Sequence, residues 1–405
     1  MDKTLSICIF SNLYPPITSG SSSFTWELSR RLTERGHRVV VVTAQVDDLP
    51  PYEEQDDVII HRMPAMRLPQ MALAHNFKWL TYTFLPKNLR WLRTLFETEK
   101  FDVIHQQNHI FDTILSSPRM AKRFNIPLLL TMHTYAQHSN PVFNWILAAL
   151  DVLARQVIIN KADVVVSTDP AIQRYVQTRH KVAQTPLIPY GIDVPKPDAT
   201  LVEEIRSRYH LAGKSPLILS LGHVIPLRNR LDLIGAMPGI LKQFPDAHLL
   251  IVGELYTQKP VELVAQLGIG EHVTFTGSVP HTDVAAFFEL VDVEAHTFAG
   301  SYPGPGIASM EAMATGLPVV TGKIAPEYNF EFLHNGQNIV MVEPDNSQEM
   351  EAAVIRLLSD RTLSEEIGRN AQQTIAKHYT WEIVCKAYED LYAAAIANNI
   401  SKQPI

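Results

Sequence analysis

Short apolar segments recur along this chain, and between them lie stretches whose apolar residues have helical spacing. The first two such segments are LSICIF at 5–10 and HRVVVVT at 37–43, with a helix predicted over 24–35. Runs of Val, Ile and Leu without alternating polar residues are typical of strands that are buried on both faces. A strand, a helix and a second strand in this order predict parallel pairing through a right-handed crossover. The fold class is therefore α/β, with doubly wound sheets.

The strand–helix alternation starts again after the linker-like segment VPKPDAT at 194–200. A chain of 405 residues is also long for a single hydrophobic core. We therefore expect two Rossmann-like domains that face a cleft. Ligands of such sheets bind beyond the carboxyl ends of the strands, so that cleft is the expected binding site.

Composition narrows the class of protein. The chain has 35 Lys and Arg against 42 Asp and Glu, and its net charge of -7 argues against a general nucleic-acid-binding protein. Cys8 and Cys385 lie far apart and indicate neither a disulfide framework nor a cysteine-based metal site, so we expect a reducing, cytoplasmic location. No apolar run approaches the roughly 20 residues of a membrane span. The apolar start is interpreted as a first strand, not as a signal peptide.

A loop rich in glycine and proline, over 300–306, precedes a helix predicted over 307–314. Gly316 and Pro318 end this helix, and a buried strand is predicted over 317–320. The first amides of a helix and the positive end of its dipole suit an anion or sugar hydroxyls. The alternative is an ordinary turn between a strand and a helix.

Two segments of the first half do not follow the alternation. Residues 66–95 mix aromatic residues, among them Trp79 and Trp91, with Lys and Arg on predicted helical segments. This composition suits a lipid acceptor and a peripheral membrane contact, but we favour the alternative, a helix that packs on the sheet with a solvated basic face. The apolar helix predicted over 142–159 could shape an acceptor pocket or belong to the core.

Several phrases occur in an order that is specific, although each phrase alone is weak. They are YPPITSGSSSFTWELSRRLTERGHRVVVVT, FDVIH, PLLLTMHTY, IPYGID, LGHVIPLRNRLDLIGA, LLIVGE, FTGSVP and SMEAMATGLPVV. Over nearly its whole length the chain resembles the retaining glycosyltransferases of family four, which have the two-domain GT-B fold. The resemblance implies that the last helix, from Trp381, returns to the first domain. The expected domains are then 1–195 with 379–405 on the acceptor side, and 196–378 for the nucleotide sugar.

The resemblance also implies roles for single residues. His133 matches a histidine that contacts the transferred sugar, and Arg228 takes the place of a diphosphate-binding lysine; these two are the expected catalytic residues. Glu311 matches a glutamate that accepts hydrogen bonds from the ribose. The remaining expected donor-binding residues are Gly20, Gly222, His223, Gly277, Ser278, Val279, Gly304, Pro305, Gly306 and Ile307. The acceptor-side candidates are Trp79, Trp91, Tyr135 and His138.

Two positions depart from the family pattern. Pro303 stands where the family has a glutamate that contacts the transferred sugar, and His223 stands where it usually has an arginine beside the diphosphate. A neutral imidazole carries less charge than a guanidinium, so diphosphate binding is expected to rest on Arg228 and on backbone amides. We interpret the neighbouring Arg230 as a surface arginine.

The expected function is transfer of a hexose from a nucleotide diphosphate sugar, with UDP preferred to GDP, to a lipid, glycan or small-molecule acceptor. Retention of the anomeric configuration follows from the resemblance. No metal ion or other cofactor is expected, because no carboxylate pair of the Asp-x-Asp type lies near the predicted cleft. Two alternatives stay open: a non-catalytic nucleotide-sugar-binding protein on the same fold, and a nucleotide-sugar 2-epimerase, which would need further carboxylates.

Overall fold

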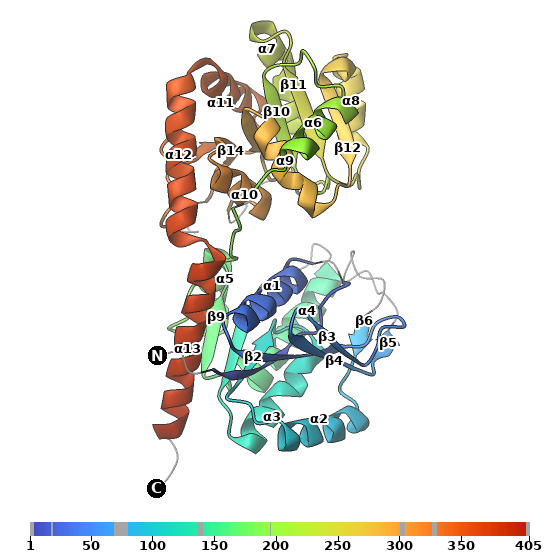
Figure 1. The fold of residues 1–405 in the computed structure, drawn as a ribbon, viewed down its shortest axis with the longest axis vertical. Helices are drawn as coiled ribbons and strands as arrows, with labels where there is room; N and C mark the ends of the chain where they lie inside the picture. Colours follow the sequence, from blue (N-terminus) through green and yellow to red (C-terminus); the bar gives the residue numbers. More distant parts are fainter. Residues whose placement is uncertain are drawn as a thin grey trace. The chain divides into compact units, whose positions relative to one another are not determined.

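The chain forms two α/β units (Figure 1). Met1–Gly191 together with Trp381–Ile405 make unit 1, and Ile192–Thr380 make unit 2. Each unit contains a largely parallel sheet between helices, which confirms the two Rossmann-like domains. The computed structural model describes residues 4–17, 19–68, 80–135, 141–194, 196–299, 304–325 and 330–401.

Unit 1 contains a seven-stranded sheet in the order β3-β4-β2-β1-β7-β8-β9. Neighbouring strands pair in parallel, except that β3 runs antiparallel to β4. The strands are β1 (Ser6–Phe10), β2 (Arg38–Ala44), β3 (Tyr52–Gln55), β4 (Val58–Met63), β7 (Val103–Gln107), β8 (Leu128–Met132) and β9 (Val164–Ser167). The winding direction reverses at β1, so the loops after β1 and β7 meet at the carboxyl edge of the sheet.

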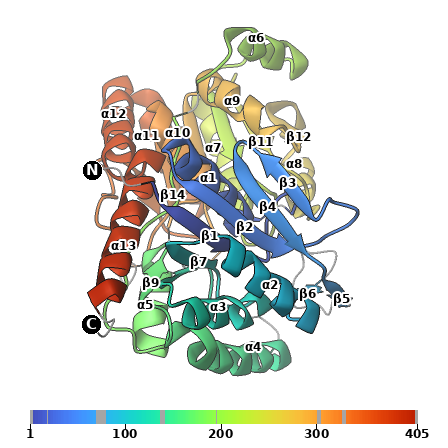
Figure 2. The same cartoon turned by 60° about the horizontal axis from the view of Figure 1, so that its bottom comes forward.

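Helices cover both faces of this sheet (Figure 2). They are α1 (Gly20–Glu34), α2 (Pro86–Thr98), α3 (Ser117–Phe124), α4 (Pro141–Ala154), α5 (Pro170–Arg179) and α13 (Trp381–Ser401). Successive side chains of a strand point to opposite faces, so two separate apolar cores form. Cys8 and Val40 face the core beneath α2 and α3, whereas Ile7 and Val41 face the core beneath α1 and α13.

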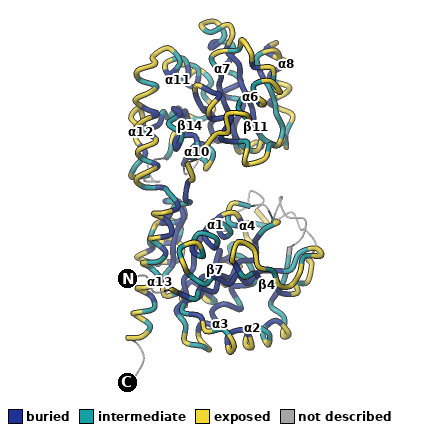
Figure 3. The backbone as a smooth tube through the Cα atoms, viewed as in Figure 1, coloured by how far each residue is buried: buried dark blue, intermediate teal, exposed yellow. Residues whose placement is uncertain are grey.

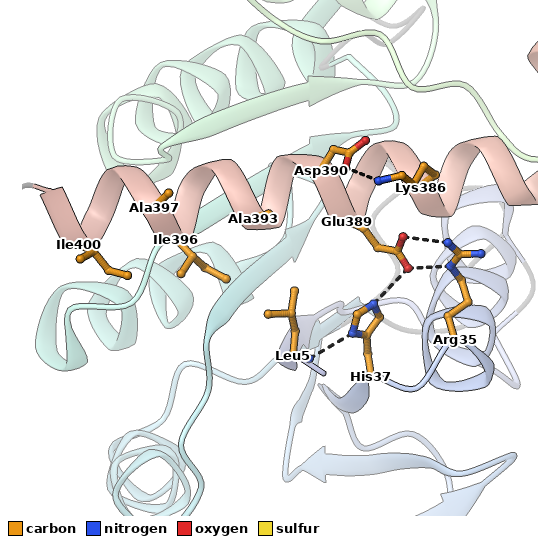
Figure 4. A pocket seen from close by; sticks show the side chains of 10 residues that line it. All are labelled: Leu5, Arg35, His37, Lys386, Glu389, Asp390, Ala393, Ile396, Ala397 and Ile400. Carbon is orange, nitrogen blue, oxygen red and sulfur yellow. Dashed lines mark hydrogen bonds and ion pairs between the residues drawn. The ribbon is translucent and has the colours of Figure 1, made fainter. Parts of the chain in front are cut away.

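The returning helix α13 is held to unit 1 by polar contacts at the edge of its apolar face. Glu389 accepts two hydrogen bonds from Arg35, at 2.6 Å from Nε and 2.8 Å from Nη2, and it contacts His37 at 3.1 Å (Figure 4). Further along the helix, the buried hydroxyl of Tyr392 lies 2.7 Å from Nδ1 of His105 on β7. Arg35 lowers the pKa of Glu389 more than partial burial raises it, so this carboxylate stays ionised.

Unit 2 contains a six-stranded parallel sheet in the order β12-β11-β10-β13-β14-β15. The strands are β10 (Leu217–Leu221), β11 (His248–Val252), β12 (Val273–Gly277), β13 (Val293–His296), β14 (Val319–Gly322) and β15 (Val340–Val342). The helices are α6 (Ala199–Arg208), α7 (Leu231–Gln243), α8 (Lys259–Leu267), α9 (Val284–Leu290), α10 (Ile307–Thr315), α11 (Ser347–Ser359) and α12 (Arg361–His378). The winding direction reverses between β10 and β13, where a ligand site is expected.

Residues 66–95 differ from the expected helical segments. Met66–Leu68 (β5) and Leu80–Tyr82 (β6) pair as antiparallel strands, and helix begins only at Pro86. Trp91 is half-buried and packs against the core of unit 1, with its ring 5.3 Å from that of His61. Trp91 therefore supports the packed-helix interpretation, while Trp79 lies outside the described residues.

Helix α4 and the π-helical turn η2 (Arg155–Ile159) bear on two expectations. Most residues of α4 are exposed or half-buried (Figure 3). Ala154 at the end of α4 and Ile158 and Ile159 of η2 belong to a core of unit 1, so only the end of the segment is core. By length and composition the helix Pro141–Ile159 could cross a membrane. Only 22% of its apolar window is buried inside the protein, whereas the core helix of a soluble protein would be mostly buried. The expectation that no apolar run approaches a membrane span was therefore wrong, because the few polar residues here do not interrupt its apolar character.

Candidate active site

In unit 2, an arginine folds back over the end of β10. Gly222 has a φ of +114°, and a Cβ at this residue would lie 1.9 Å from Nη1 of Arg228. Glycine is therefore required here both for its backbone conformation and for space. Nη1 of Arg228 donates to the carbonyl of Leu221 at 3.4 Å, and the side chain is half-exposed. A guanidinium in this place can present paired donors to phosphate oxygens.

Arg230 is not a surface arginine, and that expectation was wrong. Its side chain is only 1% exposed, and its Nη2 donates to the carbonyls of Leu221 at 3.0 Å and Gly222 at 3.1 Å. Its Nε and Nη1 have no hydrogen-bond partner within the described part of the chain. Burial and the charge of Arg228 lower the pKa of Arg230 to about 9, while Glu294 opposes the shift. At neutral pH the residue remains a buried cation, which adds positive potential at the strand end.

A buried acid–histidine pair lies on the adjacent strand, β13. Glu294 is fully buried, with Oε1 2.7 Å from Nδ1 of His296, and Oε2 accepts a hydrogen bond from Ser309 at 3.0 Å. Burial lowers the pKa of His296 against the opposing effect of Glu294, and Arg230 and Arg228 lower it further. A neutral ring that donates from Nδ1 leaves Nε2 as an acceptor, and no described residue donates to it.

His296 faces the start of α10. A Cβ on Gly306 would lie 3.8 Å from Nε2 of His296, and Gly306 is the N-cap of α10 without a side-chain cap. Gly304 is packed so closely that a Cβ would lie 2.4 Å from the ring of Phe330. Pro305 is buried and Ile307 is exposed, whereas Pro303 lies outside the described residues. No described side chain caps the first backbone amides of the helix, which lie beside a buried acceptor nitrogen. This arrangement suits a ligand with both anionic and hydroxyl groups.

Glu311 lies on α10, and its side chain is largely buried. Its Oε1 is 3.2 Å from Nε2 of the exposed His281. His281 follows the expected base-recognition loop, in which Gly277 has a φ of +71° and Val279 packs on the core. Because of this contact, the loop after β12 lies beside α10. Ser278 is exposed, and the ring of His223 packs edge-on against Tyr256 at 5.4 Å.

In unit 1, His133 stands at the end of β8 with both ring nitrogens hydrogen-bonded. Nδ1 lies 2.9 Å from the hydroxyl of Tyr190, and Nε2 lies 2.7 Å from Oε1 of Gln107. Gly20, the first residue of α1, is close to the same hydroxyl, since a Cβ there would lie 3.5 Å from it. Burial lowers the pKa of His133 to about 3, and the charge of His109 contributes. His133 is therefore uncharged at neutral pH.

The acceptor-side candidates do not form one group in the described structure. Tyr135 is exposed and lies 5.8 Å from the ring of Tyr175, while Trp91 belongs to the packed face of α2. Trp79 and His138 fall outside the described residues.

Four polar residues of this site were missed from the sequence. They are Arg230, Glu294, His296 and Ser309. A signal was present for two of them, because Glu294 and His296 alternate within an otherwise apolar strand and so face the same side of the sheet. A buried polar pair at a strand end needs partners, and such a pair is often functional.

Family models match both units. The model described as Glycosyltransferase Family 4 matches residues 18–196, and the model described as Glycosyl transferases group 1 matches residues 202–374. Together they leave only short parts of the chain unmatched. The chain therefore belongs to the family 4 type of glycosyltransferases with the GT-B fold.

Named relatives agree with this membership. A GDP-mannose-dependent alpha-(1-6)-phosphatidylinositol monomannoside mannosyltransferase of Mycobacterium tuberculosis is 30% identical, but the match spans only 54% of this chain and 58% of that protein. The alpha-monoglucosyldiacylglycerol synthase of Acholeplasma laidlawii is 23% identical over 98% of this chain and 99% of that protein. Among solved structures, sucrose-phosphate synthase from Thermosynechococcus elongatus has a TM-score of 0.73 at 20% identity, covering 97% of this chain and all of that one.

Replacing Arg228 by alanine is expected to weaken binding of UDP or GDP by roughly 10- to 100-fold. A charge-assisted hydrogen bond to a phosphate contributes about 1.5–3 kcal/mol, which corresponds to this range. Isothermal titration calorimetry measures the change. Arg206→Ala removes a half-exposed arginine of α6 and serves as the control, with unchanged affinity. Equal nucleotide affinity in wild type and in a folded Arg228→Ala protein would contradict the phosphate position.

Proposed function

We propose that this protein transfers a hexose from a nucleotide diphosphate sugar to a membrane lipid acceptor, with retention of the anomeric configuration. The observation that carries the proposal is the arrangement in unit 2, where Arg228 and buried Arg230 stand at the end of β10. In the same unit, the first amides of α10 lie beside His296, and no described side chain caps them. The strand ends on either side of the winding reversal thus provide positive charge and backbone donors together.

The leaving diphosphate is the group that the site must stabilise. As the bond between the anomeric carbon and the phosphate oxygen breaks, negative charge develops on the diphosphate. Arg228 can contact these oxygens directly, and the buried Arg230 raises the local positive potential at the end of β10. In this proposal no metal ion takes part in the transfer, because arginines and helix amides supply the stabilisation. Added Mg²⁺ or Mn²⁺ then leaves the rate unchanged.

Retention follows if the acceptor oxygen attacks on the face from which the diphosphate leaves. A new bond then forms between the anomeric carbon and the acceptor oxygen, and the acceptor proton passes to the departing phosphate. His133 is poorly suited to take this proton, because its pKa is about 3 and both its ring nitrogens are already hydrogen-bonded. Its role in the proposal is a polar contact with the transferred sugar.

A lipid acceptor is supported by the exposed apolar surface of α4. Val142, Trp145 and Val152 lie at helical spacing, and Trp145 is 74% exposed. The opposite side of the same helix is tied to unit 1 by the buried residues Asp151 and Ala154. A helix tied down on one side and apolar on the other suits the membrane interface rather than a span. Two of the relatives named above have lipids in their names, which agrees with this position.

We place the protein at the cytoplasmic face of a membrane, as a peripheral protein with UDP as the preferred nucleotide. Both cysteines are free and buried, in keeping with a reducing compartment. The M. tuberculosis relative is named for GDP-mannose, so GDP-sugars are the alternative donors. One other function has an observation in its favour. His223 supplies an imidazole where an arginine is usual, and a weaker diphosphate site would suit a protein that binds nucleotide sugars without turnover.

The test of the proposed function is nucleotide diphosphate release from UDP- and GDP-sugars. The protein is incubated with vesicles that contain diacylglycerol, phosphatidylinositol or their monoglycosylated forms. We expect release that depends on one donor and one lipid, together with a glycolipid product of retained configuration by NMR. Nucleotide binding without release from any donor would favour the binding protein, and conversion of the donor sugar without an acceptor would favour an epimerase.

Replacing Trp145 by glutamate is expected to lower vesicle binding at least about tenfold. A tryptophan buries roughly 150–250 Å² of surface, at about 25 cal/mol per Å². Co-sedimentation with anionic vesicles measures the loss. Tyr52→Glu changes another exposed aromatic residue of unit 1 and should bind vesicles as wild type does. Equal loss in both variants, or no loss in Trp145→Glu, would contradict the assignment of α4 to the membrane.

A further inference from the structure

Three polar side chains meet inside unit 1, beneath helix α4. His109 follows β7, Asp151 lies on α4, and His180 is the C-cap of α5. Each of these side chains is at most 1% exposed. One potential ligand atom from each residue lies within 4.8 Å of the others. The cluster has no part in the transfer reaction proposed above.

The spacing of these atoms fits a metal coordination sphere. Nε2 of His109 lies 3.5 Å from Oδ1 of Asp151, and Nε2 of His180 lies 3.1 Å from the same oxygen. Ligands that bind Zn²⁺ at about 2.0–2.1 Å in a tetrahedron are separated from one another by about 3.3 Å. The two distances in the cluster, 3.5 and 3.1 Å, lie on either side of that value.

Several polar atoms of the cluster have no hydrogen-bond partner among the described residues. Despite the short distances, both ring nitrogens of His109 and of His180, and Oδ1 of Asp151, lack a hydrogen-bond partner within the described residues. Buried polar atoms are almost always satisfied, so this many open positions in one place requires an explanation. The other carboxylate oxygen, Oδ2, contacts Nε of Arg179 at 3.3 Å, which orients the carboxylate and leaves Oδ1 toward the two imidazoles.

The backbone beside the cluster is also irregular. The chain changes from α-helix to π-helix at Arg155, one turn after Asp151. Such turns are rare and are frequent at functional sites, because they shift the direction of neighbouring side chains. The rings of Tyr175 and His180 pack edge to face with their centroids 5.1 Å apart, so Tyr175 lines the same site. Two imidazoles and one carboxylate favour a zinc-type cation over Mg²⁺ or Ca²⁺, which prefer oxygen ligands.

We propose that Nε2 of His109, Oδ1 of Asp151 and Nε2 of His180 bind one divalent cation of the zinc type, which joins α4 to the end of β7 and to α5. The site is structural. It holds the exposed apolar helix in place, because its three ligands come from three separate elements of unit 1. A divalent cation also balances the charge of the buried carboxylate of Asp151.

The test uses the full chain without a histidine tag, stripped of metal with a chelator and dialysed. Titration with Zn²⁺ against a chromophoric chelator should show one ion bound per chain, and thermal scanning should show a higher melting temperature with Zn²⁺. His180→Gln and Asp151→Asn should each weaken binding by more than about 100-fold, beyond the 10- to 100-fold cost of losing an outer-shell partner. His334→Gln, at an exposed histidine of unit 2, is the matched control and should bind as wild type does.

X-ray absorption of the zinc-loaded wild-type protein provides a readout that does not depend on whether the variants fold. The expected spectrum shows two imidazole ligands and oxygen ligands. The proposal is overturned by a wild-type protein that binds no stoichiometric zinc, by a spectrum without imidazole, or by folded His180→Gln and Asp151→Asn proteins that bind zinc as tightly as wild type.

Discussion

The carbonyl oxygens of Leu221 and Gly222, at the end of β10, determine how charge is arranged in unit 2. They accept hydrogen bonds from Arg230 and, at Leu221, from Arg228, so two cations are held at one strand end. Holding like charges together and burying one of them is unfavourable, unless negative charge lies nearby. Glu294 on the adjacent strand supplies part of that charge, and a bound diphosphate would supply more. Glycine is needed at position 222 because a side chain there would displace Arg228 from the strand end.

The two units use the same topology for different chemistry. In both, the winding direction reverses beside the first strand, and polar residues gather at the carboxyl edge. In unit 2 this edge carries arginines, a buried acid–histidine pair and the first amides of α10, which suit a nucleotide sugar. In unit 1 it carries the uncharged His133 near Gly20, and the unit also exposes the apolar face of α4. A polar donor and a membrane acceptor would thus each meet a surface of matching character.

The buried strands and most helices were predictable because buried parallel strands are continuously apolar and the helices between them have apolar residues at helical spacing. The order of short phrases was enough to place the chain in its family. The sequence did not predict features that depend on tertiary contacts rather than on a periodic pattern of residues. Arg230 looks like a loop residue, yet it folds under the strand end, and the pairing of β5 with β6 depends on contacts that are remote from local propensity. The His109–Asp151–His180 cluster could not be found from the sequence, because its members lie on separate elements.

The exposure of α4 was likewise not predictable, since an apolar helix of this length has the same composition in a core as at a membrane. Only the packing of Asp151 and Ala154 on one side, with Trp145 exposed on the other, distinguishes the two cases. Tertiary contacts therefore determine the interpretation of this segment.

Hydrogen exchange of the full chain, followed by mass spectrometry with and without nucleotide, tests the central claim about unit 2. The account predicts that saturating UDP or GDP slows exchange in peptides over 221–231 and 304–312. Uridine or guanosine, which lack the diphosphate, should protect 221–231 much less, because the arginines there have no phosphate to contact. Bound nucleotide diphosphate without protection of 221–231, or equal protection by the nucleoside alone, would contradict the account.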